Sequence, residues 1–308
     1  MRLRRLHGAD AVRACSLLLA TPFIVSACTS GAQQGASDGE IGAENLPAHS
    51  IAAAPIGIEQ LNAVLWTQTS VEYRAVALQS YERARSMLDT ALADPTWTAT
   101  LEQTGPFDQL PPALIVDVDE TVLDNSPYQA RLILDRQRFS AKSWGRWVGE
   151  AAAAAVPGAL EFCTEAASKG VTIFYVSNRT ADLEEGTRAN LERLGFPLQE
   201  GVDVVLLRGE KPEWQTSDKG PRRQTVASDY RVLLLIGDNM GDFTSAASGT
   251  IAERSAVADE QFDYWGRRWI VLPNPQYGSW ERALLGADTP ESDAERLQRK
   301  LQALDPKR

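Results

Sequence analysis

Histidine is almost absent from this sequence, which has only His7 and His49 among its 308 residues. Both precede the segment in which hydrophobic periodicity begins, so we expect the folded domain to contain no histidine. This excludes His-ligated zinc sites, Ser-His-Asp hydrolases and phosphatases that depend on a catalytic histidine. Acid–base chemistry in the domain would therefore have to use carboxylates, lysine or tyrosine.

Cysteine is also scarce, and its three occurrences are Cys15, Cys28 and Cys163. The first two belong to an expected N-terminal signal and its anchor. The domain then contains Cys163 alone, so no internal disulfide is possible in it. The residues after Cys163 lack the arginine of a Cys-x5-Arg phosphatase, and Cys163 lies on the apolar face of a predicted helix. We expect it to be a buried, small hydrophobic residue.

The first 27 residues resemble a bacterial secretory signal. Arginines precede an apolar stretch that is too short to span a bilayer, and Val25-Ser26-Ala27-Cys28 closes it. This ending is similar to a lipobox, in which the peptide is cut before the cysteine and the cysteine is diacylated. The alternative is an ordinary signal peptide with an incidental cysteine. Thr29 is not the aspartate of an inner-membrane retention signal, so we expect an exported protein anchored to the outer membrane through Cys28.

The rest of the chain divides by composition into three segments. Residues 28–56 are rich in Gly, Ala, Ser, Gln and Glu and predict a flexible tether. Residues 57–290 suit one α/β domain, and residues 291–308 a polar tail. Loss of residues 1–27 turns 31 basic and 41 acidic residues into 27 and 40, a formal charge of −13. This charge argues against nucleic-acid polymers and anionic membrane surfaces as ligands. The sequence does not indicate the oligomeric state.

Hydrophobic runs alternate with helical patterns along the domain. This predicts a Rossmann-like parallel sheet flanked by helices, with an N-terminal helical segment and a small cap insertion. One or two helices are expected over 58–93, and others over 157–169 and 181–194, while 128–156 forms the polar, aromatic insertion. The expected strands are 113–118, 171–176, 204–207, 233–236 and a possible fifth at 269–272.

Polar side chains follow three of these strands at their carboxyl ends, where parallel sheets bind ligands. Asp117 and Asp119 end the first strand, Ser177-Asn178-Arg179 the second, and Gly237-Asp238-Asn239 the fourth. Two carboxylates at the end of a buried strand are costly unless a metal or another cation offsets them. The alternative interpretation is that Asp117 and Asp119 are turn residues.

Four motifs resemble those of the haloacid dehalogenase superfamily. The string Asp117-Val118-Asp119-Glu120-Thr121-Val122-Leu123-Asp124-Asn125-Ser126-Pro127-Tyr128 is similar to the first motif of its class C acid phosphatases, which are bacterial lipoproteins and include 5′-nucleotidases. Residues 174–179, Lys219 and residues 237–243 resemble the second, third and fourth motifs. Residues 272–281 also look like the end of these phosphatases.

The resemblance implies a Mg²⁺-dependent acid phosphatase that hydrolyses small phosphomonoesters through an aspartyl-phosphate. Asp117 would attack phosphorus, and Asp119 would protonate the leaving oxygen and then deprotonate water. Ser177 would donate to a phosphoryl oxygen, and Lys219 would neutralise charge beside Asp117. Asp117, the backbone carbonyl of Asp119 and Asp238 would hold Mg²⁺, which favours oxygen ligands.

Several positions have alternatives. Arg208 and Lys211 are rivals of Lys219, which could be a solvated surface residue. Asp242 could orient the metal's ligands or begin a helix. Ser177 could simply cap a helix, and Glu120 and Asp124 more often form structural hydrogen bonds.

Aromatic residues predict the substrate's leaving group. Asn178 is a candidate substrate contact. The resemblance to nucleotide-hydrolysing members of the family places Trp144 and Tyr277 at the pocket mouth, where the two rings would stack on a nucleotide base. Trp147 and Trp280 are expected to be packing residues. Two other functions remain open: a phosphotransferase that passes the phosphoryl group to an acceptor alcohol, and a non-catalytic surface binding or storage lipoprotein.

Overall fold

The computed structural model describes residues 58–286, 288, 290 and 292–307. The predicted signal peptide, the tether and Cys28 lie outside the described residues. Within the described ranges, no helix is long and apolar enough to cross a membrane.

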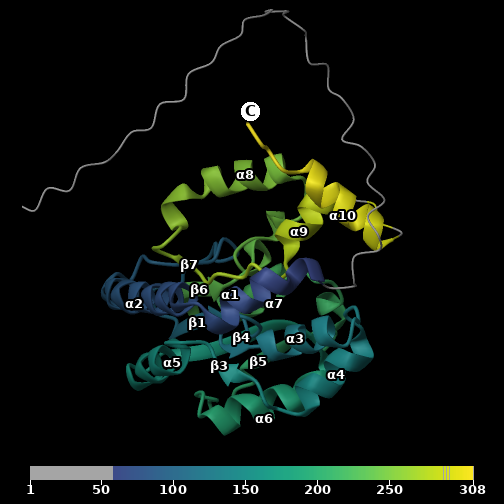
Figure 1. Cartoon of the computed structure of the whole chain (residues 1–308). Coiled ribbons are helices and arrows are strands. Elements are labelled where there is room, and N and C mark those ends of the chain that lie inside the picture. The colour runs from purple at the N-terminus through teal and green to yellow at the C-terminus, as the bar shows by residue number, and fades with distance from the viewer. Residues whose placement is uncertain (1–57, 287, 289, 291, 308) are drawn as a thin grey trace, which may run out of the picture. The chain divides into compact units, whose positions relative to one another are not determined.

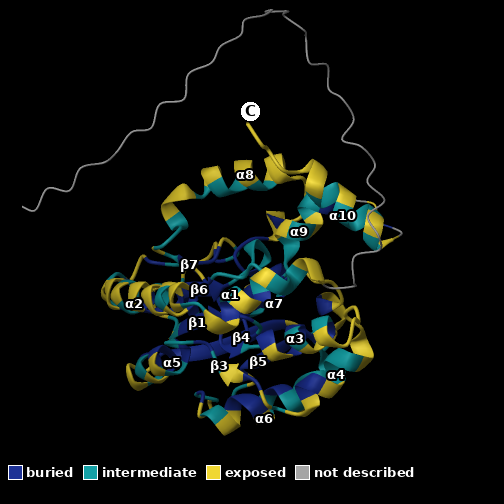
Figure 2. Ribbon diagram, in the orientation of Figure 1, coloured by how far each residue is buried: buried dark blue, intermediate teal, exposed yellow. Residues whose placement is uncertain are grey.

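A five-stranded parallel sheet forms the centre of the domain, in the order β5-β4-β1-β6-β7. Its strands are β1 (Pro112–Val116), β4 (Thr172–Thr180), β5 (Val205–Arg208), β6 (Arg231–Gly237) and β7 (Trp269–Val271). Their side chains are mostly buried, as the dark strands in Figure 2 show, so both faces of the sheet are covered. The predicted α/β fold with its parallel sheet is confirmed, and the possible fifth strand forms.

Helices cover the sheet and surround it (Figure 1). They are α1 (Leu61–Thr69), α2 (Val71–Ala93), α3 (Ser126–Leu134), α4 (Ala141–Gly149), α5 (Ala159–Ser168), α6 (Glu184–Leu194), α7 (Gly220–Asp229), α8 (Ile251–Glu260), α9 (Ser279–Leu285) and α10 (Asp293–Gln302). Because parallel crossovers are right-handed, the return from β5 across the sheet to β6 places α7 on the face opposite α5.

The N-terminal helical segment is two helices, separated at Ser70. This residue is extended, with φ −82° and ψ 138°, and its side chain accepts a hydrogen bond from the Tyr73 amide at 3.0 Å. Such an N-cap starts α2 as a new helix. Buried residues of α2, including Tyr81 and Leu88, pack into the main core.

The cap insertion contains α3, α4 and β3 (Ala154–Ala155), which pairs antiparallel with β2 (Leu123–Asp124). After it along the chain, α5 carries Cys163, which is fully buried and free. Burial raises the pKa of the Cys163 thiol to about 12. The expectation of a buried cysteine is confirmed.

The helices α7, α8 and α10 are among those that were not predicted from the sequence. In α7, Arg222 and Arg223 occupy fully buried positions, so the helix lacks an ordinary apolar stripe. None of the residues of α8 is buried, and none of α10 either. The stretch expected as a polar tail therefore contains α10, whose Lys300 forms ion pairs with Glu281 at 2.6 Å and Glu59 at 2.9 Å.

One strand is longer than predicted. The expected strand 171–176 continues as β4 to Thr180, with a register shift against β5 between Ser177 and Thr180. Asn178 is exposed while Ser177 and Arg179 are buried, which follows the alternation of a strand. The polar second motif therefore lies within the strand and not after it.

Candidate active site

Three neighbouring strands bring the predicted residues to one edge of the sheet. Strands β4, β1 and β6 are adjacent and parallel, so their carboxyl ends lie side by side. Asp117 continues the β1–β6 pairing, because its amide donates to the Ile236 carbonyl at 2.8 Å. Asp238 directly follows β6, and Ser177 lies near the end of β4.

Asp117, Asp238 and Asp242 form a compact carboxylate cluster. One oxygen of each lies within 4.8 Å of the others, and Asp117 and Asp242 are only 7% and 6% exposed. Burial raises the pKa of Asp117 to about 7, with Lys219 opposing the shift and Asp242 adding to it. Burial, then the charges of Asp242 and Asp117, likewise raise the pKa of Asp238. The cluster thus holds more negative charge than its protein surroundings offset.

Lys219 is the cation that meets this cluster. Its Nζ donates to the carboxylates of Asp117 and Asp242, at 2.6 Å for Asp242, and the residue is 4% exposed. Burial by itself would lower the pKa of Lys219, but the two carboxylates raise it. In the described part of the chain, neither Arg208 nor Lys211 forms an ion pair with the cluster. Lys211 lies instead 4.3 Å from the centroid of the Trp214 ring.

The loop after β6 explains how Asp242 reaches the cluster. Its Oδ2 accepts a hydrogen bond from the Asn239 amide at 2.9 Å, which closes a capping box at η4 (Met240–Asp242). A Cβ at Gly237 would lie 2.2 Å from the same oxygen, so only glycine fits there. Asp242 therefore begins a short helix and also lies beside the other two carboxylates.

Asp119 is held by partners that do not belong to the cluster. Arg179 forms an ion pair with it at 2.8 Å, and Asn125 donates to it at 2.8 Å. The Arg179 guanidinium also donates to Thr187 at 3.0 Å, and the residue is only 3% exposed. No role for Arg179 was predicted from the sequence. The available signal was an arginine that follows Ser177 and Asn178 at the end of a predicted strand.

Ser177 and Asn178 differ in their hydrogen-bond partners. Ser177 is fully buried, and its Oγ accepts from the Arg179 amide at 3.1 Å and donates to Asp119 at 3.4 Å. Asn178 donates to the Ser217 carbonyl at 3.0 Å and accepts from Arg222 at 2.6 Å. The Asn178 side chain therefore ties β4 to the loop that leads to Lys219.

The aromatic candidates lie around Asp119 and Glu120. The Trp144 ring is 5.3 Å from the Arg179 guanidinium, and the Tyr277 hydroxyl donates to the Glu120 carboxylate. Trp147 is buried and donates to Asn125 at 2.8 Å, as a packing residue would. The expectation for Trp280 was wrong: it is 41% exposed, because it begins α9 on the outside of the domain.

Glu120 and Asp124 form structural hydrogen bonds, as expected. Glu120 has a left-handed backbone with φ 55°, and its carboxylate accepts from the Asn125 amide at 3.0 Å. Burial raises the pKa of Glu120 well above its usual value. The Asp124 carboxylate accepts from the Ser126 amide at 2.8 Å, where α3 begins.

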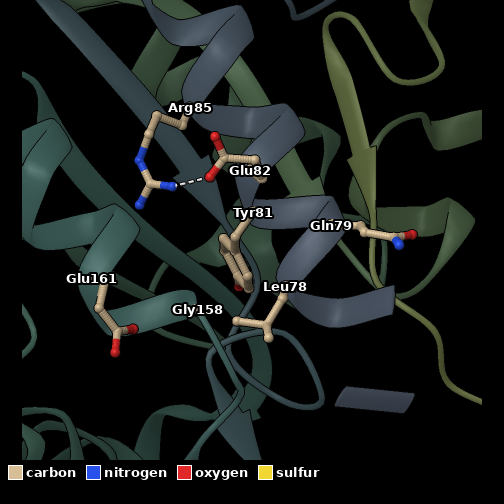
Figure 3. Close-up of a pocket in the computed structure, with 7 residues that line it drawn as sticks. All are labelled: Leu78, Gln79, Tyr81, Glu82, Arg85, Gly158 and Glu161. Atoms are coloured by element: carbon tan, nitrogen blue, oxygen red, sulfur yellow. Dashed lines mark hydrogen bonds and ion pairs between the residues drawn. The ribbon is translucent and has the colours of Figure 1, made fainter. Parts of the chain in front are cut away.

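A separate cavity of about 450 Å³ lies between α2 and α5 (Figure 3). Leu78, Tyr81, Arg85 and Gly158 are among its lining residues, and Arg85 pairs with Glu82 across its upper rim. None of the clustered carboxylates lines it. The polar strand ends therefore mark the candidate active site, and this cavity does not.

Comparisons with known proteins show which family the chain belongs to. A family model described as HAD superfamily, subfamily IIIB (Acid phosphatase) matches residues 29–280. The solved class C acid phosphatase from Bacillus anthracis is 34% identical, with a TM-score of 0.71, and covers 82% of this chain and 99% of its own. Its tungstate-bound structure has 35% identity and a TM-score of 0.72 with the same coverage.

More distant relatives come from plants. The stem 28 kDa glycoprotein of Glycine max is 25% identical over 53% of this chain and 58% of its own length. Acid phosphatase 1 of Solanum lycopersicum is 26% identical over 53% of this chain and 57% of its own length. The chain thus spans little more than half the length of these relatives.

The parallel sheet, with carboxylates after the neighbouring strands β1 and β6 and polar residues at the end of β4, is that of a haloacid dehalogenase-type phosphatase. The chain belongs to the haloacid dehalogenase superfamily, subfamily IIIB, the acid phosphatases. The resemblance drawn from the four motifs is confirmed, and so is the class of enzyme, a phosphomonoesterase.

Proposed function

We propose that this protein is a Mg²⁺-dependent acid phosphatase that hydrolyses small phosphomonoesters, including 5′-nucleotides, through an aspartyl-phosphate. The observation that carries this proposal is the contact of Lys219 with Asp117 beside Asp238 and Asp242. A nucleophilic carboxylate with a buried cation beside it is suited to attack a charged phosphoryl group.

The donor set fits a hard divalent cation. The three clustered side chains offer only carboxylate oxygens, the ligand type that Mg²⁺ prefers. Three carboxylates and one lysine would repel a phosphate dianion, and bound Mg²⁺ would supply the missing positive charge. Asp117, Asp238 and the backbone carbonyl of Asp119 would hold the ion. Asp242 is a further candidate ligand, because one of its carboxylate oxygens also lies within 4.8 Å of oxygens of Asp117 and Asp238.

The protein's own residues would carry the reaction in two displacements. An oxygen of Asp117 would bond to phosphorus as the ester P–O bond breaks, while Asp119 gives its proton to the leaving oxygen. Asp119 would then take a proton from water as that water attacks phosphorus, and the bond between Asp117 and phosphorus would break to release inorganic phosphate. Ser177 would donate to a phosphoryl oxygen, and Lys219 would offset the charge that develops beside Asp117.

The leaving group would bind on the side of Asp119 where the aromatic residues gather. Trp144 lies over Arg179, and Tyr277 is anchored to Glu120. Two such rings are suited to stacking on a nucleotide base. This arrangement supports nucleoside monophosphates as substrates.

For location, we propose lipid attachment at Cys28, which rests on the sequence Val25-Ser26-Ala27-Cys28. The anchor would hold the domain in the cell envelope, most simply at the outer membrane. Expression of a Cys28→Ser variant tests it, because loss of acylation should release the protein into the soluble fraction. A variant that still sediments with membranes after a high-salt wash would contradict the anchor.

One assay tests the enzymatic proposal. Purified protein without residues 1–27 is incubated with p-nitrophenyl phosphate in the presence of Mg²⁺, with EDTA, and with Mg²⁺ restored after EDTA. We expect hydrolysis that EDTA abolishes and Mg²⁺ restores. A folded protein without activity in any of these conditions would overturn the proposed function, and activity that EDTA leaves unchanged would overturn its metal dependence.

A further inference from the structure

Arg222 is a fully buried cation just behind the second motif. Its guanidinium donates to the Ser177 carbonyl, to Asn178 Oδ1 at 2.6 Å and to the Asp218 carbonyl at 3.2 Å. These acceptors belong to the end of β4 and to the residue just before Lys219. Arg222 therefore joins the strand that presents Ser177 to the loop that presents Lys219.

The charge of Arg222 has no direct counterion among the described residues. All its acceptors are uncharged oxygens, and its buried Nε lacks a hydrogen-bond partner. The neighbouring Arg223 is equally buried but forms an ion pair with Glu102 at 2.6 Å. Burial lowers the pKa of Arg222 to about 10, so the group remains a cation at neutral pH. A buried charge without a partner is costly unless a ligand or another charge offsets it.

Arg231, another buried arginine for which the described residues show no ion pair, serves as a structural reference. Arg231 donates to the carbonyls of Ala91 at 3.2 Å and Asp94 at 2.6 Å, and its Nε also lacks a partner. It begins β6, at the opposite end of the sheet from the carboxylate cluster. The two arginines thus have the same kind of backbone contacts, but only Arg222 lies at the ligand-binding edge.

We propose that Arg222 is a positioning residue for phosphate binding, which holds Ser177 and the Lys219 loop in place and favours the bound anion with its buried charge. This inference rests on the proposed phosphatase function and deepens it. The side chain acts from behind β4, since it is fully buried and its contacts are to protein oxygens. It is therefore not a catalytic residue in this proposal.

The test compares Arg222→Met, Arg222→Gln and Arg222→Lys with the matched control Arg231→Met. The measurements are the inhibition constant of inorganic phosphate, the KM and kcat for p-nitrophenyl phosphate, and the increase in Tm that inorganic phosphate produces. The last of these reports binding without turnover.

We expect the neutral Arg222 variants to raise the phosphate inhibition constant and KM by about tenfold or more, because they remove a buried positive charge from the anion site and the contacts that hold its two sides together. The phosphate-induced increase in Tm should shrink in parallel. Arg222→Lys keeps the charge but loses the planar fork, so it should show a smaller loss of roughly threefold. Arg231→Met should lower Tm without changing the phosphate inhibition constant.

Folded neutral variants that bind phosphate as tightly as the wild type would overturn the proposal. A loss in Arg222→Lys as large as in the neutral variants would overturn the electrostatic part of it. An equal loss in Arg231→Met would show that general destabilisation is the cause, which would also overturn the proposal.

If neither neutral variant folds, the Arg222→Lys variant tests the proposal instead. Unchanged phosphate binding in Arg222→Lys would then overturn the positioning role. Failure of the proposed function is distinct, because the wild type itself would then neither hydrolyse the ester nor bind phosphate.

Discussion

Arg179 donates two hydrogen bonds to the carboxylate of Asp119. The Nη2 and Nε atoms of Arg179 lie 2.8 Å and 3.1 Å from Oδ1 of Asp119. The same guanidinium is fixed by Thr187 on one side and lies over the Trp144 ring on the other. The residue proposed as general acid and base is thus oriented by a buried arginine that also contacts the cap insertion. In the proposed mechanism, this one side chain therefore contacts both the proton donor, Asp119, and the ring proposed to bind the leaving group, Trp144.

Arg179→Met should therefore damage the reaction most where the leaving group needs a proton. General acid catalysis contributes roughly a hundredfold or more, and an alkoxide leaving group depends on it far more than p-nitrophenolate does. We expect kcat/KM to fall about a hundredfold for a small alkyl phosphate and less than about tenfold for p-nitrophenyl phosphate. Arg131→Met is the control, since Arg131 also lies over a tryptophan, Trp147, and pairs with Glu150. Equal losses on both substrates would contradict the positioning of Asp119.

Asp117→Asn should preserve the fold and remove turnover. The substitution keeps the side-chain shape but leaves no nucleophile to form the aspartyl-phosphate, so kcat should fall by more than roughly a thousandfold. The check is a steady-state assay, with a circular dichroism spectrum to verify folding. Asp108→Asn, at an exposed position, should keep wild-type activity. Substantial activity in a folded Asp117→Asn protein would refute the mechanism.

Asp238→Asn should weaken metal binding more than it disturbs folding. It removes one anionic oxygen from the carboxylate cluster, while the amide can still accept the 2.8 Å contact with Asn274 after reorientation. The Mg²⁺ concentration for half-maximal activity should rise about tenfold or more, since second-sphere changes alone can cost that much. Titration of activity with Mg²⁺ measures it. An unchanged Mg²⁺ requirement would place the metal elsewhere.

The metal-free protein should lose stability as the pH rises. Burial raises the pKa of Asp117 to about 7 in the folded state, so the folded protein binds a proton that the unfolded chain has released. The contribution of Asp117 to stability is then greatest below the ordinary aspartate pKa and declines, by up to about 1.4 kcal/mol per pH unit for one proton, until the pH passes about 7. Thermal unfolding in EDTA between pH 5 and pH 8 should show this decline, and added Mg²⁺ should reduce it. A Tm that rises over this interval in EDTA would contradict the burial argument.

Trp144→Ala should distinguish substrates by their leaving groups. If the ring stacks on a base, its loss costs about 1–3 kcal/mol, so KM for a 5′-nucleotide should rise about tenfold or more. KM for a small aliphatic phosphate should barely change, because that substrate has nothing to stack. Trp280→Ala is a suitable control, since Trp280 is an exposed aromatic of α9. Equal changes in KM for both substrates would mean that Trp144 has only a structural role.

The motifs could be located from the sequence because their setting is regular. Runs of buried aliphatic residues formed β1 and β6 close to the expected positions, so Asp117 and Asp238 fell at adjacent strand ends. Parallel topology then brings the polar ends together without any further information. Helix α7 was not predicted because its pattern is irregular. Two of its buried positions are arginines, and a search for hydrophobic periodicity counts arginine as a polar, exposed residue.

The sequence by itself determined the fold class, the family and the aspartates, because these depend on local patterns and on motif spacing. Tertiary structure decided which distant side chains meet. It placed Lys219, and neither Arg208 nor Lys211, against Asp117, and it paired Arg179 with Asp119. It also placed Arg222 behind Ser177 without a counterion. Such contacts join residues of separate strands and helices, so they depend on how those elements pack, which no local pattern encodes.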